Sequence, residues 1–263
     1  MYWLKNDHLE AGFTWKKGIR LADLRVPGGE NLLRETDDPY HGLKTWVMAP
    51  SDIIALRDML SGQPASMEFV SEREIRLKTL NPNEWGLVLE WVVTLEEDRP
   101  AITILQRIHN EGEVHRYVGI WSLAAFPADC VFRIPFARSP HVPRDFPNNI
   151  AVFPWTDIGD TRISSTREYL QLEIREGQED GNVKLGLVQP QGRIDVLKQG
   201  IVLEFTAPYD PDAEYPEGGS NVTIYASPAN RPTTMGEVEH MGPLEVLAPG
   251  KAMELPVRMT LEM

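Results

Sequence analysis

The β character of this chain is clearest in residues 84–123, which read EWGLVLEWVVTLEEDRPAITILQRIHNEGEVHRYVGIWSL. Three runs within it, at Glu84–Glu96, Ala101–Ile108 and His115–Leu123, are rich in β-branched, aromatic and leucine residues, which is typical of strands. The turn residues Asn110-Glu111-Gly112 separate the last two runs. We therefore expect these two strands to pair as a β-hairpin.

Short strand-like runs recur outward from this stretch along the whole chain. Its 21 prolines and 20 glycines interrupt the sequence too often for long helices. Only Ser51–Leu60 reads as a helix, with Ser51 as its N-cap. The further predicted strands are Tyr169–Arg175, Val183–Val188, Gly200–Thr206, Asn221–Ala226, Gly236–His240 and Met253–Leu261. Successive strands without intervening helices favour an antiparallel sandwich or barrel, and we expect a single all-β domain over residues 1–263.

The composition narrows the class of protein. The chain has 263 residues, of which 42% are hydrophobic, enough to close a sizeable core. Its 26 Lys and Arg against 39 Asp and Glu give a formal charge of −13, which argues against a nucleic-acid partner because phosphate contacts need clustered cations. We expect no membrane partner, since no run approaches the roughly 20 apolar residues that span a bilayer. The sequence leaves the compartment open between the cytoplasm and export with a removed signal.

The proline-rich segment Phe126–Thr156 is the least regular part of the sequence. Its six prolines argue against a continuous central strand. Its aromatic, arginine and asparagine residues suggest a functional loop across the mouth of a sheet, although an ordinary edge connection fits equally well.

Compact motifs of the common chemistries are missing from the sequence. It contains no Gly-rich phosphate loop, GxSxG elbow or HExxH helix, and its one cysteine, Cys130, lies in an apolar run where a thiol usually packs inertly. His109 and His115 could face each other across the predicted hairpin and, with Glu111 or Glu113, bind a divalent metal. A solvated turn is the simpler interpretation, so we expect neither a metal nor a cofactor.

A pair of carboxylates lies near the C-terminus, in Met235–Pro243 (MGEVEHMGP). Glu237 and Glu239 are two residues apart, so in a strand both side chains point to one face. Two carboxylates on one face could supply a general base, although a solvated strand face would have the same pattern.

Two stretches near the ends of the chain resemble the galactose mutarotase-like (aldose 1-epimerase-like) superfamily. Gly18–Leu33 (GIRLADLRVPGGENLL), followed by Thr45–Pro50 (TWVMAP), is similar to the opening hairpin of that fold. Tyr215–Tyr225 (YPEGGSNVTIY) resembles the strand that precedes the catalytic carboxylate of the family. The segments that follow it at the usual interval are Glu237–Glu239, Gly242–Leu244 and Leu247–Gly250. The order and spacing cover almost the whole chain, which most resembles an uncharacterised bacterial branch, the DUF4380-like group.

This resemblance implies a β-supersandwich, two packed antiparallel sheets with one short helix and a carbohydrate site on a concave face. In mutarotases of this fold a C-terminal glutamate removes the proton of the anomeric hydroxyl, and a histidine protonates the ring oxygen. The glutamate position falls on Glu239 or Glu237, and Glu239 is preferred because it lies nearer the Gly242–Leu244 turn. Where the family has its histidine, this sequence reads Gly119–Leu123 (GIWSL). The resemblance therefore implies sugar binding more strongly than mutarotation.

Aromatic and polar residues complete the predicted sugar site. Trp46, Trp121 and Trp155 could stack on the apolar face of a pyranose, although large aromatics in β-sandwiches more often fill the core. Other groups could hydrogen-bond hydroxyls or a uronate carboxylate, although the charged ones are more often surface charges. These are Arg20, Lys44, Arg144, Asn149, Arg162, Lys184 and Tyr215.

Three functions stay open on this basis. The one we favour is an epimerase-like enzyme that acts on a mono- or oligosaccharide with Glu239 as base. The second is a lyase or glycoside hydrolase, in which Glu239 would act with Arg144, Lys184 or Glu237. The third is a non-catalytic sugar-binding module. A homodimer would suit exposed sheet edges, although the sequence contains no legible interface signal.

Overall fold

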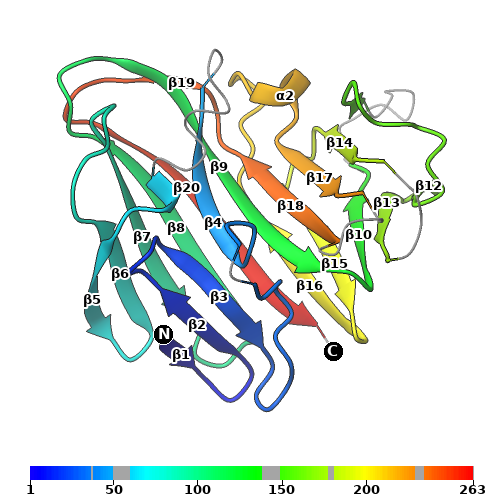
Figure 1. Cartoon of the computed structure of the whole chain (residues 1–263), viewed down its shortest axis with the longest axis horizontal. Coiled ribbons are helices and arrows are strands. Elements are labelled where there is room, and N and C mark those ends of the chain that lie inside the picture. The colour runs from blue at the N-terminus through cyan, green and yellow to red at the C-terminus, as the bar shows by residue number, and fades with distance from the viewer. Residues whose placement is uncertain (37, 50–59, 138–148, 177–180, 229–233, 263) are drawn as a thin grey trace.

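The computed structural model describes residues 1–36, 38–49, 60–137, 149–176, 181–228 and 234–262 (Figure 1). In this part of the chain the strands form two large antiparallel sheets that share one hydrophobic core. The predicted all-β sandwich is therefore confirmed.

The first sheet combines strands from both ends of the chain. Its strands are β1 (Tyr2–Lys5), β2 (Glu10–Thr14), β3 (Arg20–Arg25), β4 (Leu43–Met48), β9 (Arg116–Pro127), β11 (Ile150–Val152), β14 (Val183–Leu187), β17 (Val222–Ala226), β18 (Met235–Met241) and β19 (Glu245–Leu247). The order across the sheet is β1–β2–β3–β4–β9–β18–β17–β14–β11, and β19 pairs with β9 beside this path. The long strand β9 thus lies between β4 and β18.

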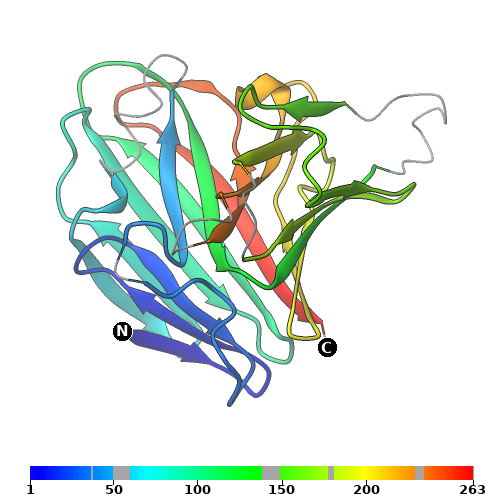
Figure 2. The same cartoon turned by 45° about the vertical axis from the view of Figure 1, so that its right-hand side comes forward.

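The second sheet is built mainly from the middle of the chain. Its strands are β5 (Ala65–Ser71), β6 (Glu74–Thr79), β7 (Leu87–Leu95), β8 (Ala101–Asn110), β10 (Cys130–Pro135), β12 (Ile163–Ser165), β13 (Tyr169–Ile174), β15 (Ile194–Lys198), β16 (Ile201–Thr206) and β20 (Ala252–Glu262). The order is β12–β13–β10–β15–β16–β20–β8–β7–β6–β5. Figures 1 and 2 show β10, β12 and β13 at one end of the molecule and β5 and β6 near the other.

Alternation along the strands builds the core between the sheets. In β20 the residues Met253, Leu255, Val257, Met259 and Leu261 are all buried, whereas the residues between them are more exposed. Each apolar side chain buried in this way stabilises the fold by about 1.5–3 kcal/mol. The period of two therefore fixes which face of each strand meets the opposite sheet.

A buried chain of hydrogen bonds also links the two sheets. Trp91 Nε1 of β7 donates to Thr45 Oγ1 of β4 at 2.8 Å, and Gln106 Nε2 of β8 donates to Ser122 Oγ of β9 at 2.8 Å. The Thr45 hydroxyl in turn donates to Gln106 Oε1. Buried polar groups are costly only when they lack a hydrogen-bond partner, and these four side chains partner one another. The hydrogen bonds therefore align β4 and β9 on the second sheet without leaving one of the four side chains unpaired.

The hairpin predicted for the strands on either side of Asn110–Gly112 is wrong. β8 pairs with β7 and β20, and β9 pairs with β4 and β18, so the two strands lie in different sheets. Asn110 holds the crossing, because its Nδ2 donates to the carbonyls of Val114 and Leu247, each at 2.9 Å, and its Oδ1 accepts the N–H of Gly112 at 3.1 Å. The turn residues therefore mark a step from one layer to the other.

The segment Phe126–Thr156 is more regular than its prolines suggested. Cys130–Pro135 forms β10, which pairs with both β13 and β15, and Ile150–Val152 forms the edge strand β11. Pro127 and Pro135 are the last residues of β9 and β10, so they end strands without interrupting one. Residues 138–148, including Arg144, lie outside the described residues.

Helical structure is slight in the described part of the chain. The predicted helix Ser51–Leu60 lies outside the described residues except for Leu60 and stays a prediction. A short turn of helix, α2 (Pro216–Gly219), follows Tyr215 and lies near the start of β17 in Figure 1. None of the described helical segments is long and apolar enough to cross a membrane.

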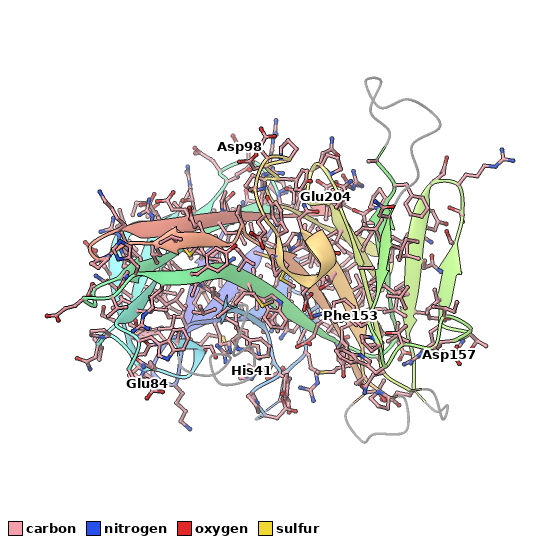
Figure 3. All side chains as sticks on the ribbon, turned by 90° about the horizontal axis from the view of Figure 1, so that it is seen from above. His41, Glu84, Asp98, Phe153, Asp157 and Glu204 are labelled. Carbon is pink, nitrogen blue, oxygen red and sulfur yellow. The ribbon has the colours of Figure 1, made fainter. Side chains whose placement is uncertain are left out.

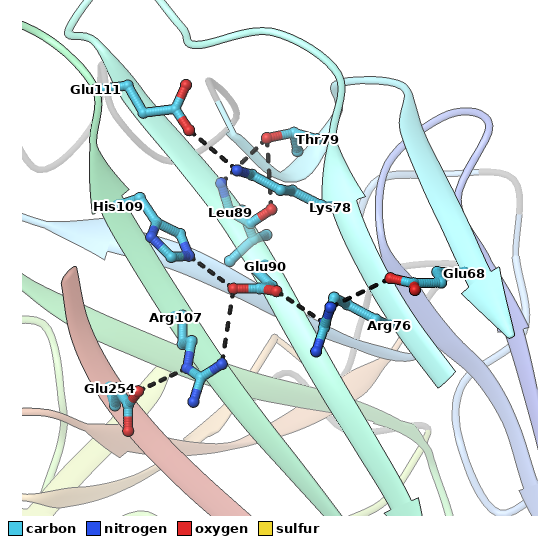
Figure 4. Close-up of polar contacts among 10 residues, drawn as sticks. All are labelled: Glu68, Arg76, Lys78, Thr79, Leu89, Glu90, Arg107, His109, Glu111 and Glu254. Carbon is cyan, nitrogen blue, oxygen red and sulfur yellow. Dashed lines mark hydrogen bonds and ion pairs between the residues drawn. The ribbon is translucent and has the colours of Figure 1, made fainter. Parts of the chain in front are cut away.

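Charged side chains cover the outer face of the second sheet around β7 and β8 (Figure 4). Glu90 of β7 contacts His109 Nε2 at 2.7 Å, Arg76 Nε at 3.2 Å and Arg107 Nη1 at 3.8 Å. His109 therefore faces Glu90 of its own sheet and does not face His115 across a hairpin, so the geometry required for the proposed metal site is missing. Among the described residues, no group of three or more His, Cys, Asp or Glu side chains is placed to hold a metal ion.

Candidate functional site

A pocket of about 660 Å³ opens on the face of the first sheet that is turned away from the second. Among the described residues, those of β4, β9, β14, β17 and β18 form the floor of the pocket. The segments before β4, after β11 and around α2 form its walls. Figure 3 views the sandwich from above, with His41, next to the lining residue Tyr40, on the opposite side from Glu204 of the second sheet.

Strand alternation explains why polar residues gather here. Val238 packs in the main core, whereas its neighbours Glu237 and Glu239 line the pocket. Across the sheet Glu239 is paired directly with Thr223 and with Leu123, and residues paired in this way share a face. Five neighbouring strands thus present one set of side chains to the core and the other to the pocket.

Glu239 lies at the base of the pocket and is 2% exposed. Its Oε2 accepts hydrogen bonds from Thr223 Oγ1 at 2.6 Å and Trp121 Nε1 at 3.1 Å, and lies 2.9 Å from Lys184 Nζ. The second carboxylate oxygen, Oε1, receives none of these three contacts. The carboxylate is therefore fixed through one oxygen.

Lys184 of β14 bridges two carboxylates. Its Nζ lies 2.7 Å from Glu217 Oε1 as well as 2.9 Å from Glu239 Oε2, and 4.8 Å from the ring centres of both Trp121 and Phe153. Burial alone would lower the pKa of Lys184, but the attraction of Glu239 and Glu217 outweighs it and raises the pKa above the ordinary value of 10.5. Lys184 is therefore a protonated, positively charged group at neutral pH.

Glu217 reaches Lys184 from an unusual backbone conformation. Its φ and ψ of 53° and 46° are left-handed, a region that non-glycine residues rarely adopt, and Gly218 continues it with φ of 74°. Such a conformation costs about 1 kcal/mol and persists where the surroundings impose it. The turn of α2 therefore holds the Glu217 carboxylate over the pocket at some cost in backbone energy.

Aromatic rings form the apolar part of the pocket. Trp46 and Trp121 are paired across β4 and β9, stand edge to face with centroids 5.0 Å apart, and are each 3% exposed. Phe153 and Trp155 lie nearer the mouth, with centroids 5.5 Å apart, and Trp155 is 55% exposed. The deep tryptophans therefore shape the floor, while a ligand would meet the open ring of Trp155 first.

Tyrosines close two further sides. Tyr215 lines the pocket beside α2, and its hydroxyl accepts the N–H of Asp210 at 2.9 Å. Its burial raises the pKa of the phenol, so Tyr215 stays neutral. Tyr225 is paired with Glu237 across β17 and β18, and its hydroxyl donates to Asn182 Oδ1 at 2.9 Å.

A second ion pair lies in the wall before β4. The guanidinium of Arg34 forms a two-pronged contact with Asp38, with both N–O distances at 2.7 Å. These hydrogen bonds hold the pKa of the Asp38 carboxyl below its usual value. Arg34 and Lys184 are the cations among the described lining residues, and both already contact carboxylates.

The structure brings most of the predicted site residues to this pocket. Those that line it are Trp46, Trp121, Trp155, Lys184, Tyr215, Glu237 and Glu239. Glu237 and Glu239 were identified from strand alternation, the three tryptophans as possible stacking rings, and Lys184 and Tyr215 from their positions in the family resemblance. This placement fits a binding site, and the role of each residue is a matter for proposal.

Other predicted residues are not placed in the pocket wall. Arg20 is buried and donates to the carbonyls of Ile19 and Ser61 at 3.0 and 2.8 Å, and its strand β3 lies beside β4 on the side away from β9. Lys44 is also buried, with its Nζ 3.9 Å from the Trp46 ring centre and 3.0 Å from the carbonyl of Pro39. Asn149 is exposed just before β11. Arg162 is fixed by Asp160, with an N–O distance of 2.8 Å, and by the carbonyl of Ser227.

Two further candidates for proton chemistry face away from the pocket. His240 follows Glu239 directly, so its ring points into the core, where it bonds to the carbonyl of Gly192 at 2.8 Å and burial lowers its pKa to about 4. Cys130 is buried, and burial raises the pKa of its thiol to about 12, which makes it a poor nucleophile, as its apolar surroundings in the sequence indicated.

Several lining residues were not identified from the sequence. They include Arg34, Asp38, Tyr40, Phe153, Asn182, Glu214, Glu217, Tyr225 and Ser227. Phe153 carried a usable signal because it stands two residues before Trp155. Tyr225 carried one because it stands two residues after Thr223 on the same strand. Glu217 carried only the turn signal of Pro216 and Gly218–Gly219, which does not indicate where its side chain points.

Comparisons with known proteins support the fold. No protein-family model matches the chain, and no curated protein matches its sequence. A protein from Escherichia coli K12 described as a proposed aldose 1-epimerase superposes with a TM-score of 0.65 at 12% identity, covering 99% of this chain and 98% of its own. A galactose mutarotase-like protein from Lactobacillus casei gives 0.64 at 11% identity, covering 100% of both chains. A galactose mutarotase related enzyme from Lactobacillus acidophilus gives 0.64 at 9%, covering 100% of this chain and 97% of its own.

These likenesses extend over the whole chain, but at such low identity they concern architecture. The expected branch, the DUF4380-like group, is matched by no family model and stays a prediction. The two packed sheets, their order and the end-to-end superpositions lead to one conclusion. The chain has the galactose mutarotase-like fold.

Proposed function

We propose that this protein binds a reducing sugar in the pocket and interconverts its anomers, with Glu239 as general base. The observation that carries the proposal is the position of Glu239, a buried carboxylate fixed through Oε2 at the base of a cavity with aromatic walls. Solved proteins of the same fold are described as a proposed aldose 1-epimerase and a galactose mutarotase related enzyme, which agrees with a sugar ligand.

Glu239 and Lys184 together would supply the proton transfers. Oε1 of Glu239 would take the proton of the anomeric hydroxyl while the C1–O bond of the ring breaks and C1 becomes an aldehyde carbon. The ring oxygen released in this step is alkoxide-like and far more basic than an amine, so the ammonium of Lys184 can donate a proton to it. Rotation about the C1–C2 bond and reversal of both transfers closes the ring on the other face. Lys184 would thus replace the histidine that the sequence lacks.

One observation favours a second function, a non-catalytic sugar-binding module. Thr223, Trp121 and Lys184 already contact Oε2 of Glu239, and a carboxylate held in this way can serve as a fixed acceptor for sugar hydroxyls. In such a module Glu239 and Glu237 would only accept hydrogen bonds from sugar hydroxyls.

The lyase and hydrolase alternatives receive less support from the geometry. A lyase needs a cation to neutralise a uronate carboxylate, but Lys184 already contacts two carboxylates. A hydrolase needs two carboxyl groups on opposite sides of the scissile bond, whereas Glu237 and Glu239 project from the same face of one strand.

We also infer that residues 1–263 form one domain, because the first sheet joins strands from both ends of the chain.

Anomer exchange tests this proposal. NMR exchange spectroscopy on a panel of aldoses should show accelerated interconversion with the wild-type protein and a loss of about 10²–10⁴-fold with Glu239→Gln, the usual range for a general base. Glu84→Gln, at an exposed position outside the pocket, is the matched control and should retain the wild-type rate. Sugar binding without any accelerated exchange would instead identify a binding module, and absence of both would reject a sugar site.

A further inference from the structure

The pocket becomes steadily more exposed from its base to its mouth. Glu239 is 2% and Lys184 5% exposed, Phe153 is half-buried, and Trp155 is 55% exposed. These residues form a continuous series of contacts, because Lys184 Nζ lies 2.9 Å from Glu239 and 4.8 Å from the Phe153 ring centre, and the Phe153 and Trp155 rings are 5.5 Å apart. Trp155 therefore marks the end of a path that starts at the proposed reacting group.

The turn that carries Trp155 is tied to the strand that carries Lys184. The Thr156 hydroxyl accepts the N–H of Lys184 at 2.9 Å and donates to its carbonyl at 3.1 Å. The Phe153 N–H bonds to the same carbonyl at 3.3 Å, and the Thr156 N–H closes the turn on the Phe153 carbonyl at 2.9 Å. Both sides of Trp155 are thus anchored to one residue of β14, and Pro154 restricts the backbone between them. An exposed indole on a fixed turn is a preformed platform.

The size of the pocket exceeds what one sugar ring requires. A hexose displaces a volume on the order of 200 Å³, about that of seven waters at ~30 Å³ each. The cavity of about 660 Å³ lies within the range of pockets that bury considerably larger ligands. One ring seated against Glu239 would leave the outer part of the pocket, including the Trp155 indole, uncovered.

We propose that the ligand is an oligosaccharide of at least two units, with the reducing unit at Glu239 and the next unit stacked on Trp155. This inference rests on the proposed sugar function and adds the length of the ligand and the residue that selects it. The C–H face of a pyranose packs against an indole with a large apolar contact, and the hydroxyl edges stay in water at the mouth. Trp155 would thus act as a specificity-determining residue that makes no contact with the reacting atoms.

Paired ligands test the proposal. Dissociation constants are measured by calorimetry for glucose against maltose and cellobiose, galactose against galactobiose, mannose against mannobiose, and xylose against xylobiose. For at least one pair the disaccharide should bind about tenfold or more tightly than its monosaccharide, the gain expected when one ring covers an aromatic surface. Trp155→Ala should reduce this ratio to near one, and Trp155→Phe should keep part of it.

The matched control is Phe69→Ala. Phe69 is 56% exposed on β5 of the other sheet, so its removal changes an equally exposed ring away from the pocket and should leave the ratio unchanged. Acrylamide quenching gives a second readout, because a bound disaccharide should shield an exposed tryptophan in the wild type and not in Trp155→Phe. Monosaccharides that bind as tightly as every paired disaccharide, or a ratio that survives Trp155→Ala, would overturn this inference while leaving the sugar function intact. If no member of the panel binds, the proposed function fails and this inference fails with it.

Discussion

Lys184 Nζ lies 2.9 Å from Glu239 Oε2, and the same ammonium lies 2.7 Å from Glu217 Oε1. One cation on β14 therefore joins a carboxylate from β18 to a carboxylate from the α2 turn. All three groups are largely buried, so their charges stabilise one another in a medium that screens them poorly. The orientation of Glu239 and the conformation of the α2 turn thus depend on the same lysine.

Two replacements of Lys184 should distinguish its role as a buried positive charge from its proposed role as a proton donor. Lys184→Met leaves Glu217 and Glu239 without their shared cation and should lower the free energy of unfolding by about 3–5 kcal/mol, as measured by urea denaturation. Lys184→Arg keeps a positive charge but gives up no proton, because the pKa of a guanidinium is too high. We expect Lys184→Arg to lose less stability than Lys184→Met and to bind sugar, yet to lose anomer exchange. Wild-type turnover in Lys184→Arg would show that Lys184 is not the proton donor.

The hydroxyl of Thr223 should position Glu239. Thr223 is fully buried and donates to Glu239 Oε2 at 2.6 Å. Thr223→Val keeps the shape and removes the donor, which should cost about 1–3 kcal/mol of stability and lower kcat several-fold, because the carboxylate loses one of its restraints. Thr223→Ser keeps a hydroxyl and should recover most of kcat. If the valine and serine variants have equal kcat, the hydrogen bond has no role in turnover.

The sequence predicts the positions of the strands better than it predicts which strands pair with one another. Runs rich in β-branched, aromatic and leucine residues locate β7, β14, β17 and β20 to within a few residues, because strand propensity is a property of each segment by itself. Pairing is a relation between distant segments, and the turn Asn110–Gly112 looks the same whether the chain folds back within a sheet or crosses to the other. The predicted hairpin failed for this reason.

The sequence likewise predicts some features of the candidate site and not others. Glu237 and Glu239 could be placed on one face from their positions within one strand, whereas the place of Trp121 beside them depends on the pairing of β9 with β18. The contact between Lys184 and Glu217 could not, because it depends on the left-handed turn of α2 and on the order of β14, β17 and β18. Arg20 illustrates the converse, since a motif-like position in the sequence does not indicate that its guanidinium will bind nearby carbonyls.

The backbone strain at Glu217 can be measured with a pair of variants. Glu217→Ala and Glu217→Gly both remove the contact with Lys184, so they differ only in how well the residue tolerates the positive φ of 53°. We expect the glycine variant to be more stable by about 1 kcal/mol in urea denaturation. The same comparison at Glu245 in β19, an ordinary strand position, should favour alanine. An alanine variant as stable as the glycine variant would show that the turn relaxes out of the left-handed conformation.

His240 should make the protein less stable in mild acid. Its ring is buried against Phe205 and the carbonyl of Gly192, and burial lowers its pKa from 6.5 to about 4. Between these values the unfolded chain binds a proton that the folded chain does not, so the free energy of unfolding falls as the pH drops through this window. The full shift corresponds to about 3 kcal/mol.

Urea denaturation of the wild type and of His240→Gln, which keeps a side-chain donor, tests this expectation. The free energies of unfolding of the two proteins should converge as the pH falls from 6.5 toward 4, because only the wild type loses this contribution. His115→Gln, at an exposed histidine, should keep the wild-type slope. Parallel curves for the wild type and His240→Gln would mean that His240 is accommodated in its charged form.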